Sequence, residues 1–401
     1  MKIVNINIHF YPESYGGATI VAEKLAHGLV SMGHDVYNIA LSMNGGDKGK
    51  DFSVYETPFG KACLINGTIP TAENRFRNSP VESVISEILG VIQPDEIYVH
   101  APQNLGVINV LEDGGWISKT KIIAHDFFWV CMQGFRTLPN GKKCDRVPSH
   151  KNCYDCAFYP GLINQTYSKL LSSLLQCKAV IFPSQYLKDE YDAILLDMTS
   201  RKLNNFHVVR NPDKAESVYE PPVNTSLGED DYNIAYFGGP GYTKGWDIVK
   251  KLHKVSPEKN YQGKKIVYNI FDAGRVVGSP WYSRNDESIN FKLSAPFHWS
   301  YAGHIFANVD LVLMPSRVNE SFGMSAREVL SSKGCALIFT NGALNELSGF
   351  DSVYEADEND VEEVYKSIIS GRTENPTFSA KEGMVYNNTS SLDYAEMLLE
   401  I

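Results

Sequence analysis

Two glutamates, Glu320 and Glu328, lie eight residues apart on either side of a short SFGMS turn. The turn follows an apolar, strand-like run at 311–314 and precedes a helical pattern, so it joins a strand to a helix. Carboxylates suit polyhydroxyl ligands because each can accept hydrogen bonds from neighbouring hydroxyls. Three backbone N–H groups of the turn could face the same crevice, those of Phe322, Gly323 and Met324. The pattern fits a sugar-binding turn, and equally two surface glutamates favoured by a helix dipole.

Glycine-containing loops occupy a strand-to-helix position in both halves of the chain. Gly16 and Gly17 precede a helical pattern in the first half, and GGPGYTKG, with Gly239 and Lys244, follows a strand in the second. Such loops present N–H groups and a helix N-terminus to an anion, and Lys244 could offset the charge of a diphosphate. The alternatives are a tight turn and a solvated lysine. The repeat of this geometry favours a ligand cleft between two domains.

Four of the seven cysteines crowd into one segment with the spacing C-x12-C-x8-C-x2-C. The ligands would be Cys131, Cys144, Cys153 and Cys156. Four thiolates satisfy tetrahedral zinc and leave no open position, so the predicted zinc is structural. Four reduced thiols in a loop, or one redox pair, are the alternatives.

Short apolar strands alternate with helical patterns, which predicts an α/β fold with parallel sheets. The polar, proline-containing stretch at 210–232 is interpreted as a linker. The predicted domains are residues 1–212, with the cysteine insertion at 127–160, and residues 213–385. A final helix at 386–401 is expected to pack back on the N-terminal domain.

Length and composition fit a two-domain globular protein. The chain has 401 residues and a formal net charge of -10, which argues against general nucleic-acid binding. Its first residues alternate like a strand and show no signal core, and no apolar run approaches the roughly 20 residues that span a bilayer. We therefore expect a cytoplasmic location.

The segment PSRVNESFGMSAREVLSSKGCALIFT resembles the E-x7-E signature of retaining GT-B glycosyltransferases of family 4. Further motifs of this family follow in the expected order: the Gly16-Gly17 pair, AHD at 124–126, FPSQYLKD at 182–189, RNP at 210–212 and KG at 244–245. The resemblance implies two Rossmann-like domains that face a central cleft, the first for the acceptor and the second for the donor.

The same resemblance implies roles for individual residues. Glu328 would bind the ribose hydroxyls of the donor nucleotide, and Glu320 would bind the transferred sugar beside the amides of Phe322 and Gly323. Lys244 and the Gly16 and Gly17 amides would stabilise the departing diphosphate, because fixed donors aimed at developing charge lower the barrier. His125 would project toward the donor sugar. The family commonly has an arginine where this chain has Gly239; Arg275 or Arg210 could supply that cation.

The predicted activity is retaining transfer of a sugar from a nucleoside diphosphate, UDP or GDP, with no catalytic metal. The expected acceptor is a growing surface glycan or a lipid-linked one, with peripheral association at the inner membrane face. One alternative is a GT-B epimerase that acts on a sugar nucleotide alone. Another is a zinc protein that binds nucleic acid through the basic residues Lys142, Lys143, Arg146 and Lys151. A glycosyltransferase acting on a modified nucleobase would combine both ideas.

Overall fold

The computed structural model describes residues 1–14, 16–43, 49–67, 71, 75–138, 143–156, 163–220, 227–255, 260–271, 291–294, 296–371 and 386–401. The chain divides into two compact units. The first contains Met1–Pro212 and Ser391–Ile401, and the second contains Asp213–Ser390.

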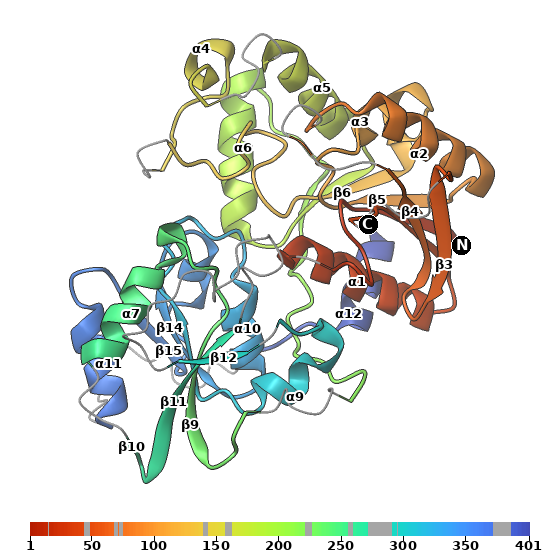
Figure 1. Ribbon diagram of the computed structural model, residues 1–401. Helices are drawn as coiled ribbons and strands as arrows, with labels where there is room; N and C mark the ends of the chain where they lie inside the picture. Colours follow the sequence, from red (N-terminus) through yellow and green to blue (C-terminus); the bar gives the residue numbers. More distant parts are fainter. Residues whose placement is uncertain are drawn as a thin grey trace. The chain divides into compact units, whose positions relative to one another are not determined.

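The first unit is built on an eight-stranded sheet of order β3-β4-β2-β1-β5-β6-β7-β8, which is parallel except for its edge strand β3 (Figure 1). The strands are β1 (Lys2–Ile6), β2 (Asp35–Leu41), β3 (Phe52–Thr57), β4 (Gly60–Ile65), β5 (Glu96–Val99), β6 (Thr120–Ile123), β7 (Ala179–Phe182) and β8 (Phe206–Val208). The helices are α1 (Gly16–Ser31), α2 (Ser79–Ile92), α3 (Val107–Asp113), η1 (Ile117–Lys119), α4 (His150–Cys153), α5 (Ile163–Gln176), α6 (Gln185–Thr199) and α12 (Ser391–Glu400).

The last helix of the chain, α12, is part of the core of this first unit. It packs on α1 so closely that a Cβ added to Gly28 would lie 2.3 Å from the Ser391 carbonyl oxygen. Near its end, the Leu398 carbonyl accepts a hydrogen bond of 2.6 Å from the fully buried Lys121 ammonium. Lys121 also pairs with Glu96 at 3.0 Å, so its buried charge is compensated.

The second unit has a seven-stranded sheet of order β10-β11-β9-β13-β14-β15, with β12 beside β11, and it is parallel except for β10. The strands are β9 (Asp231–Tyr236), β10 (Asn260–Tyr261), β11 (Lys264–Phe271), β12 (Lys292–Ser294), β13 (Leu311–Met314), β14 (Cys335–Phe339) and β15 (Val353–Ala356). The helices are η3 (Tyr242–Lys244), α7 (Trp246–Val255), η5 (Trp299–Tyr301), α9 (Ala302–Phe306), α10 (Met324–Ser331), η6 (Ala343–Leu347) and α11 (Val361–Ile369).

Both faces of this second sheet are covered. On β9, Ile234 and Tyr236 pack in one apolar cluster with residues of α7 and α11, while Ala235 packs in another with residues of α9 and α10. Successive side chains of a strand point to opposite faces, so β9 is buried on both faces. Strands β9 and β13 are parallel neighbours, so their carboxyl ends lie at the same edge of the sheet. The loops that follow the two strands can meet at this edge.

The predicted α/β fold with two parallel-sheet domains is confirmed. The interpretation of 210–232 as a linker is wrong for the described residues 213–220 and 227–232, which are part of the second unit. There Val218 N–H donates to the Ser300 carbonyl at 2.6 Å, and Gly303 N–H donates to the Glu216 carbonyl at 2.9 Å. The segment has no apolar period, which is why its sequence resembles a linker. Backbone hydrogen bonds hold it on the second unit instead.

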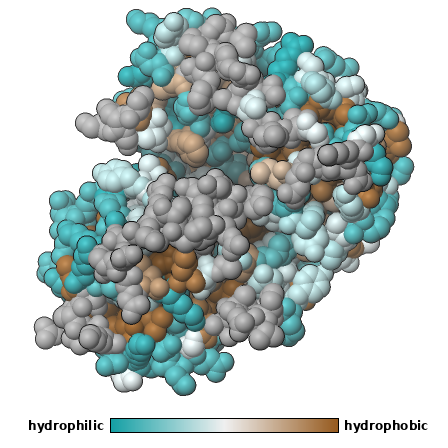
Figure 2. Space-filling model, in the orientation of Figure 1, coloured by the Kyte–Doolittle hydropathy of each residue, from teal (hydrophilic) through white to brown (hydrophobic). Residues whose placement is uncertain are grey.

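Figure 2 shows one face of the molecule. Among the coloured residues of Figure 2, hydrophobic side chains are interspersed with hydrophilic ones. Within the described ranges, no helix is long and apolar enough to cross a membrane.

Candidate active site

The turn after β13 places Glu320 at the carboxyl edge of the second sheet. Its backbone forms an isolated parallel bridge with Gly342, and its carbonyl accepts from Ala343 N–H at 2.7 Å. The Ser316 hydroxyl donates to Glu320 Oε1 at 2.6 Å. Asn341 in turn donates to the Ser316 carbonyl at 2.7 Å. The first predicted acid is thus held by two neighbouring loops, with its side chain only 13% exposed.

Lys244 and Glu320 are in direct contact. The Lys244 Nζ atom lies 2.6 Å from Glu320 Oε1, the same oxygen that accepts from Ser316. Among the described residues, Glu320 Oε2 accepts no hydrogen bond. The structure therefore joins a cation predicted to bind diphosphate to an acid predicted to bind sugar, and each balances the charge of the other.

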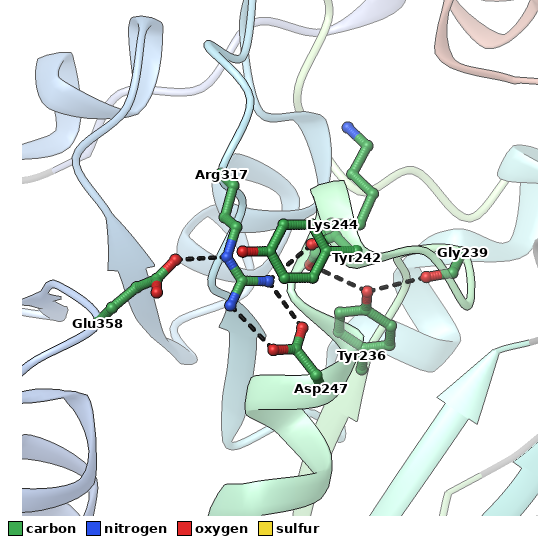
Figure 3. A network of polar contacts seen from close by, with 7 residues as sticks. All are labelled: Tyr236, Gly239, Tyr242, Lys244, Asp247, Arg317 and Glu358. Atoms are coloured by element: carbon green, nitrogen blue, oxygen red, sulfur yellow. Dashed lines mark hydrogen bonds and ion pairs between the residues drawn. The ribbon is translucent and has the colours of Figure 1, made fainter. Parts of the chain in front are cut away.

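The loop that carries Lys244 is fixed by a tyrosine beneath it. The Tyr236 hydroxyl lies 3.0 Å from both the Gly239 and the Lys244 carbonyl oxygens (Figure 3). Gly245 ends the loop at φ +75°, and a Cβ there would lie 2.1 Å from the Pro315 carbonyl oxygen. Only glycine fits this close approach between the two loops. Gly239, by contrast, faces open space, with no atom within 4 Å of an added Cβ.

The second half of the E-x7-E segment forms helix α10. Gly323 is its N-cap at φ +80° and gives no side-chain cap, so the first N–H groups of the helix depend on other partners. The Phe322 ring is buried beneath the Arg327 guanidinium, which lies 4.3 Å from the ring centroid. Glu328, one turn after the helix start, is 6% exposed. Gly323 and Met324 begin a short helix at the same edge of the sheet as Lys244. The Phe322 ring is buried in the interior.

The sites predicted in the first unit also lie at the carboxyl edge of their sheet. Gly16, at φ +81°, and Gly17 begin α1, and no atom lies within 4 Å of a Cβ added to either. His125 follows β6, and its Nε2 lies 3.0 Å from Nδ1 of His100, which follows the neighbouring strand β5. The two rings stack with centroids 5.2 Å apart. Burial lowers the pKa of His125 to about 3 and that of His100 well below its ordinary value, so both rings are neutral near pH 7.

An acidic group adjoins this histidine pair. Burial raises the pKa of Asp126 to about 6, although a hydrogen bond from Phe128 N–H and the nearby Arg75 partly oppose it. Arg75 lies over the rings of Phe76 and Phe128, with its Cζ 5.6 and 5.4 Å from their centroids. None of the motifs described above contains His100 or Arg75. The only local signal was the position of His100 directly after a strand.

The four cysteines predicted to bind zinc lie in one region of the first unit. All are free thiols, and burial raises the pKa of Cys156, which the charges of Cys153, Cys131 and Cys144 raise further. Across the part of the chain that the structure describes, no three His, Cys, Asp or Glu residues are placed to hold a metal ion. Zinc binding therefore stays a prediction. Lys142, one of the basic residues considered for nucleic acid, lies outside the described residues, as does Arg275.

Comparisons with known proteins identify the fold. No protein-family model and no curated protein matches the sequence. Three solved structures share the fold along nearly their whole length. Anabaena Alr3699/HepE in complex with UDP-glucose is 13% identical with a TM-score of 0.62, covering 100% of this chain and 98% of that one. The catalytic domain of Starch Synthase IV from Arabidopsis thaliana, bound to ADP and acarbose, is 14% identical with a TM-score of 0.62, covering 93% and 92%.

The third neighbour is sucrose-phosphate synthase from Thermosynechococcus elongatus, 13% identical with a TM-score of 0.59, covering 92% of this chain and 88% of that one. At these identities the likeness shows the fold alone. The chain has the GT-B fold, in which two Rossmann-like domains follow one another along the sequence.

Proposed function

We propose that this protein is a retaining glycosyltransferase that uses a nucleoside-diphosphate sugar. The observation that carries the proposal is the 2.6 Å contact between Lys244 and Glu320 at the carboxyl edge of the second sheet. The two residues come from separate strand-to-helix loops, and the start of helix α10 follows directly after Glu320. A cation, an acid and a helix N-terminus at one edge suit a ligand with an anionic diphosphate and a hydroxyl-bearing sugar.

Each group has a separate role in this proposal. Lys244 and the N–H groups at the start of α10 bind the diphosphate and stabilise the negative charge that grows as the sugar leaves. Glu320 accepts hydrogen bonds from the transferred sugar, and Glu328 accepts them from the ribose. When the donor enters, its diphosphate competes with Glu320 for the Lys244 ammonium, which frees Glu320 for the sugar. Gly16, Gly17 and His125 keep the roles that the family resemblance implies.

The ligands of the structural neighbours support a nucleotide-sugar donor. The neighbours include complexes with UDP, UDP-glucose and ADP. We propose a hexose donor on UDP or GDP and a surface-glycan or lipid-linked acceptor, reached in the cytoplasm at the membrane face. The test is a thermal-shift screen of UDP-, GDP- and ADP-sugars, because a ligand at 100 times its dissociation constant stabilises by about 2.7 kcal/mol.

The sugar nucleotide identified by this screen is then used to test the reaction. With the sugar nucleotide that binds, the anomeric proton is followed by NMR in the presence of candidate acceptors. We expect an α-linked product from an α-linked donor, with activity that survives EDTA because Lys244 takes the role of a divalent ion. A β-linked product would contradict retention. Release of free epimerised sugar without any acceptor would indicate an epimerase instead.

We also propose a structural zinc ion bound by Cys131, Cys144, Cys153 and Cys156. The support is their spacing and their mutual influence on the Cys156 pKa. Binding would require the thiols to close around the metal, since metal binding is coupled to local folding. Elemental analysis should find about one zinc per chain, and Cys153→Ser should reduce it and lower transfer more than nucleotide binding. Fully active, metal-free protein would reduce the cluster to four ordinary thiols.

A further inference from the structure

The Arg317 side chain makes more hydrogen bonds than any other side chain shown in Figure 3. Its Nη1 and Nη2 atoms donate to the two carboxylate oxygens of Asp247 at 2.7 and 2.9 Å. Nη1 also donates to the Tyr242 carbonyl at 2.7 Å, and Nε donates to Glu358. The guanidinium lies on the Tyr242 ring, with Cζ 3.8 Å from the centroid. Four of the five N–H groups of a guanidinium are thus engaged within the protein.

These contacts converge on the loop that carries Lys244. Arg317 holds Tyr242 by its carbonyl and its ring, and its backbone N–H donates to the Thr243 carbonyl at 2.9 Å. Tyr242, Thr243 and Lys244 form the single turn η3. On the other side of the loop, the Tyr236 hydroxyl reaches the Lys244 carbonyl. The backbone from which the Lys244 side chain projects is therefore fixed from two sides, and that side chain points away from Arg317 (Figure 3).

Arg317 also changes the electrostatics at this edge. Asp247 lies in the first turn of α7, where its negative charge would oppose a bound diphosphate. The Arg317 guanidinium lowers the pKa of Asp247, so the carboxylate is charged and its charge is balanced by the bidentate pair. Without Arg317, Asp247 and Glu358 would leave two uncompensated negative charges near the Lys244 loop.

We propose that Arg317 is a positioning residue for the donor diphosphate, holding the Lys244 loop in place and neutralising Asp247. It touches no part of the donor itself, because four of its five N–H groups are engaged by the protein. This inference rests on the proposed function, since it assigns how the Lys244 site is kept ready for its anion. Arg317 is therefore no substitute for the arginine that Gly239 replaces.

The test compares a nucleoside diphosphate with its nucleoside. Calorimetry with UDP, GDP and ADP first identifies the diphosphate that the wild-type chain binds. Arg317→Gln should weaken that diphosphate about tenfold or more and change binding of the uncharged nucleoside less than twofold, because a charged hydrogen bond contributes roughly 1.5–3 kcal/mol. Asp247→Asn combined with Arg317→Gln should recover part of the loss, since it removes the charge left unpaired. Glu358→Gln, the matched control, breaks an Arg317 contact outside the loop and should change diphosphate affinity less than twofold.

Arg317→Lys keeps the charge but not the planar fork, so it should lose a few-fold in diphosphate affinity. This variant also provides a folded protein if Arg317→Gln is unstable. Equal weakening of nucleoside and diphosphate, or no weakening of either in both variants, would overturn the positioning role. A wild-type chain that binds none of the three diphosphates would overturn the proposed function, and this inference with it.

Discussion

The carboxyl edges of the two sheets use ionisable groups in opposite ways. In the second unit, Lys244 and Glu320 are charged partners, and the lysine side chain is 42% exposed. In the first unit, burial holds His100 and His125 in their neutral forms and shifts the pKa of Asp126 upward to about 6. A parallel sheet places both sets of residues at the corresponding edge, so the topology does not cause the difference.

The cause is solvent access. A partly exposed cation paired with a carboxylate keeps its charge and can exchange that partner for another anion. In the first unit, burial disfavours the charged imidazolium of both stacked histidines, so neither ring takes up a proton near pH 7. The Lys244–Glu320 pair of the second edge is thus suited to a charged diphosphate, and the neutral histidine pair of the first edge is suited to hydroxyl groups. This division fits a donor domain and an acceptor domain, and the following variants test it.

The largest effect is expected at Glu320. Glu320→Gln should lower transfer by about 100-fold or more, because removal of one group that stabilises the transition state costs 10²–10³ in turnover. Nucleoside-diphosphate affinity should stay equal or rise, since Lys244 loses its competing partner. Turnover and calorimetric affinity separate the two effects. A parallel loss of both quantities would mean that Glu320 holds the nucleotide rather than the sugar.

Glu328 should show the reverse pattern. Glu328→Ala is expected to weaken nucleotide binding about tenfold, the equivalent of one lost charged hydrogen bond. Unlike the Arg317 variants, it should weaken the nucleoside as much as the diphosphate, because the ribose is common to both. Equal affinities in variant and wild type would remove Glu328 from the ribose site.

Gly239→Arg should strengthen the charged edge. The open space around Gly239 admits a side chain, and an arginine there would add the second cation that is common in the glycosyltransferases whose motifs this sequence resembles. We expect nucleoside-diphosphate affinity to rise by about three- to tenfold, with no gain for the nucleoside. Gly239→Gln, which adds length without charge, is the matched control. A similar gain in both variants would attribute the effect to packing.

The remaining prediction concerns the neutral edge and is a change in stability rather than in binding. Folded His100 and His125 stay unprotonated below pH 6, whereas the unfolded chain binds those protons below its pKa of about 6.5. Stability should therefore fall as the pH is lowered from 7 to 5. Asp126 has the opposite effect on stability, because the folded state keeps the proton of this carboxyl up to about pH 6. Asp126 contributes one proton and the histidines contribute two, so the effect of the histidines is the larger.

The net slope is about 1.4 kcal/mol per pH unit, and His125→Asn should flatten it by removing one titrating group. Unfolding midpoints between pH 5 and 7 measure this slope. A wild-type protein that is equally stable at both pH values would show that the histidines are not held neutral.

Local patterns predicted part of this site. The strand at 311–314, the helix that contains Glu328 and the glycine loop before Trp246 each have a short-range signature of period, glycine or turn. The contacts that define the chemistry have no such signature. Lys244 and Glu320 are 76 residues apart, Arg317 and Asp247 are 70, and His100 and His125 are 25. Only the order of strands in the sheet brings these residues together, and that order depends on packing between distant segments.

The most direct test of the account is the affinity of Lys244→Met for the nucleoside diphosphate that the wild type binds. Lys264→Met is the control, because Lys264 lies at the opposite, amino-terminal end of β11 in the same sheet. The account predicts about 30-fold weaker diphosphate binding for Lys244→Met, corresponding to roughly 2 kcal/mol for a charge-assisted contact, with nucleoside binding unchanged. Lys244→Met that binds the diphosphate within twofold of the Lys264→Met control would contradict it.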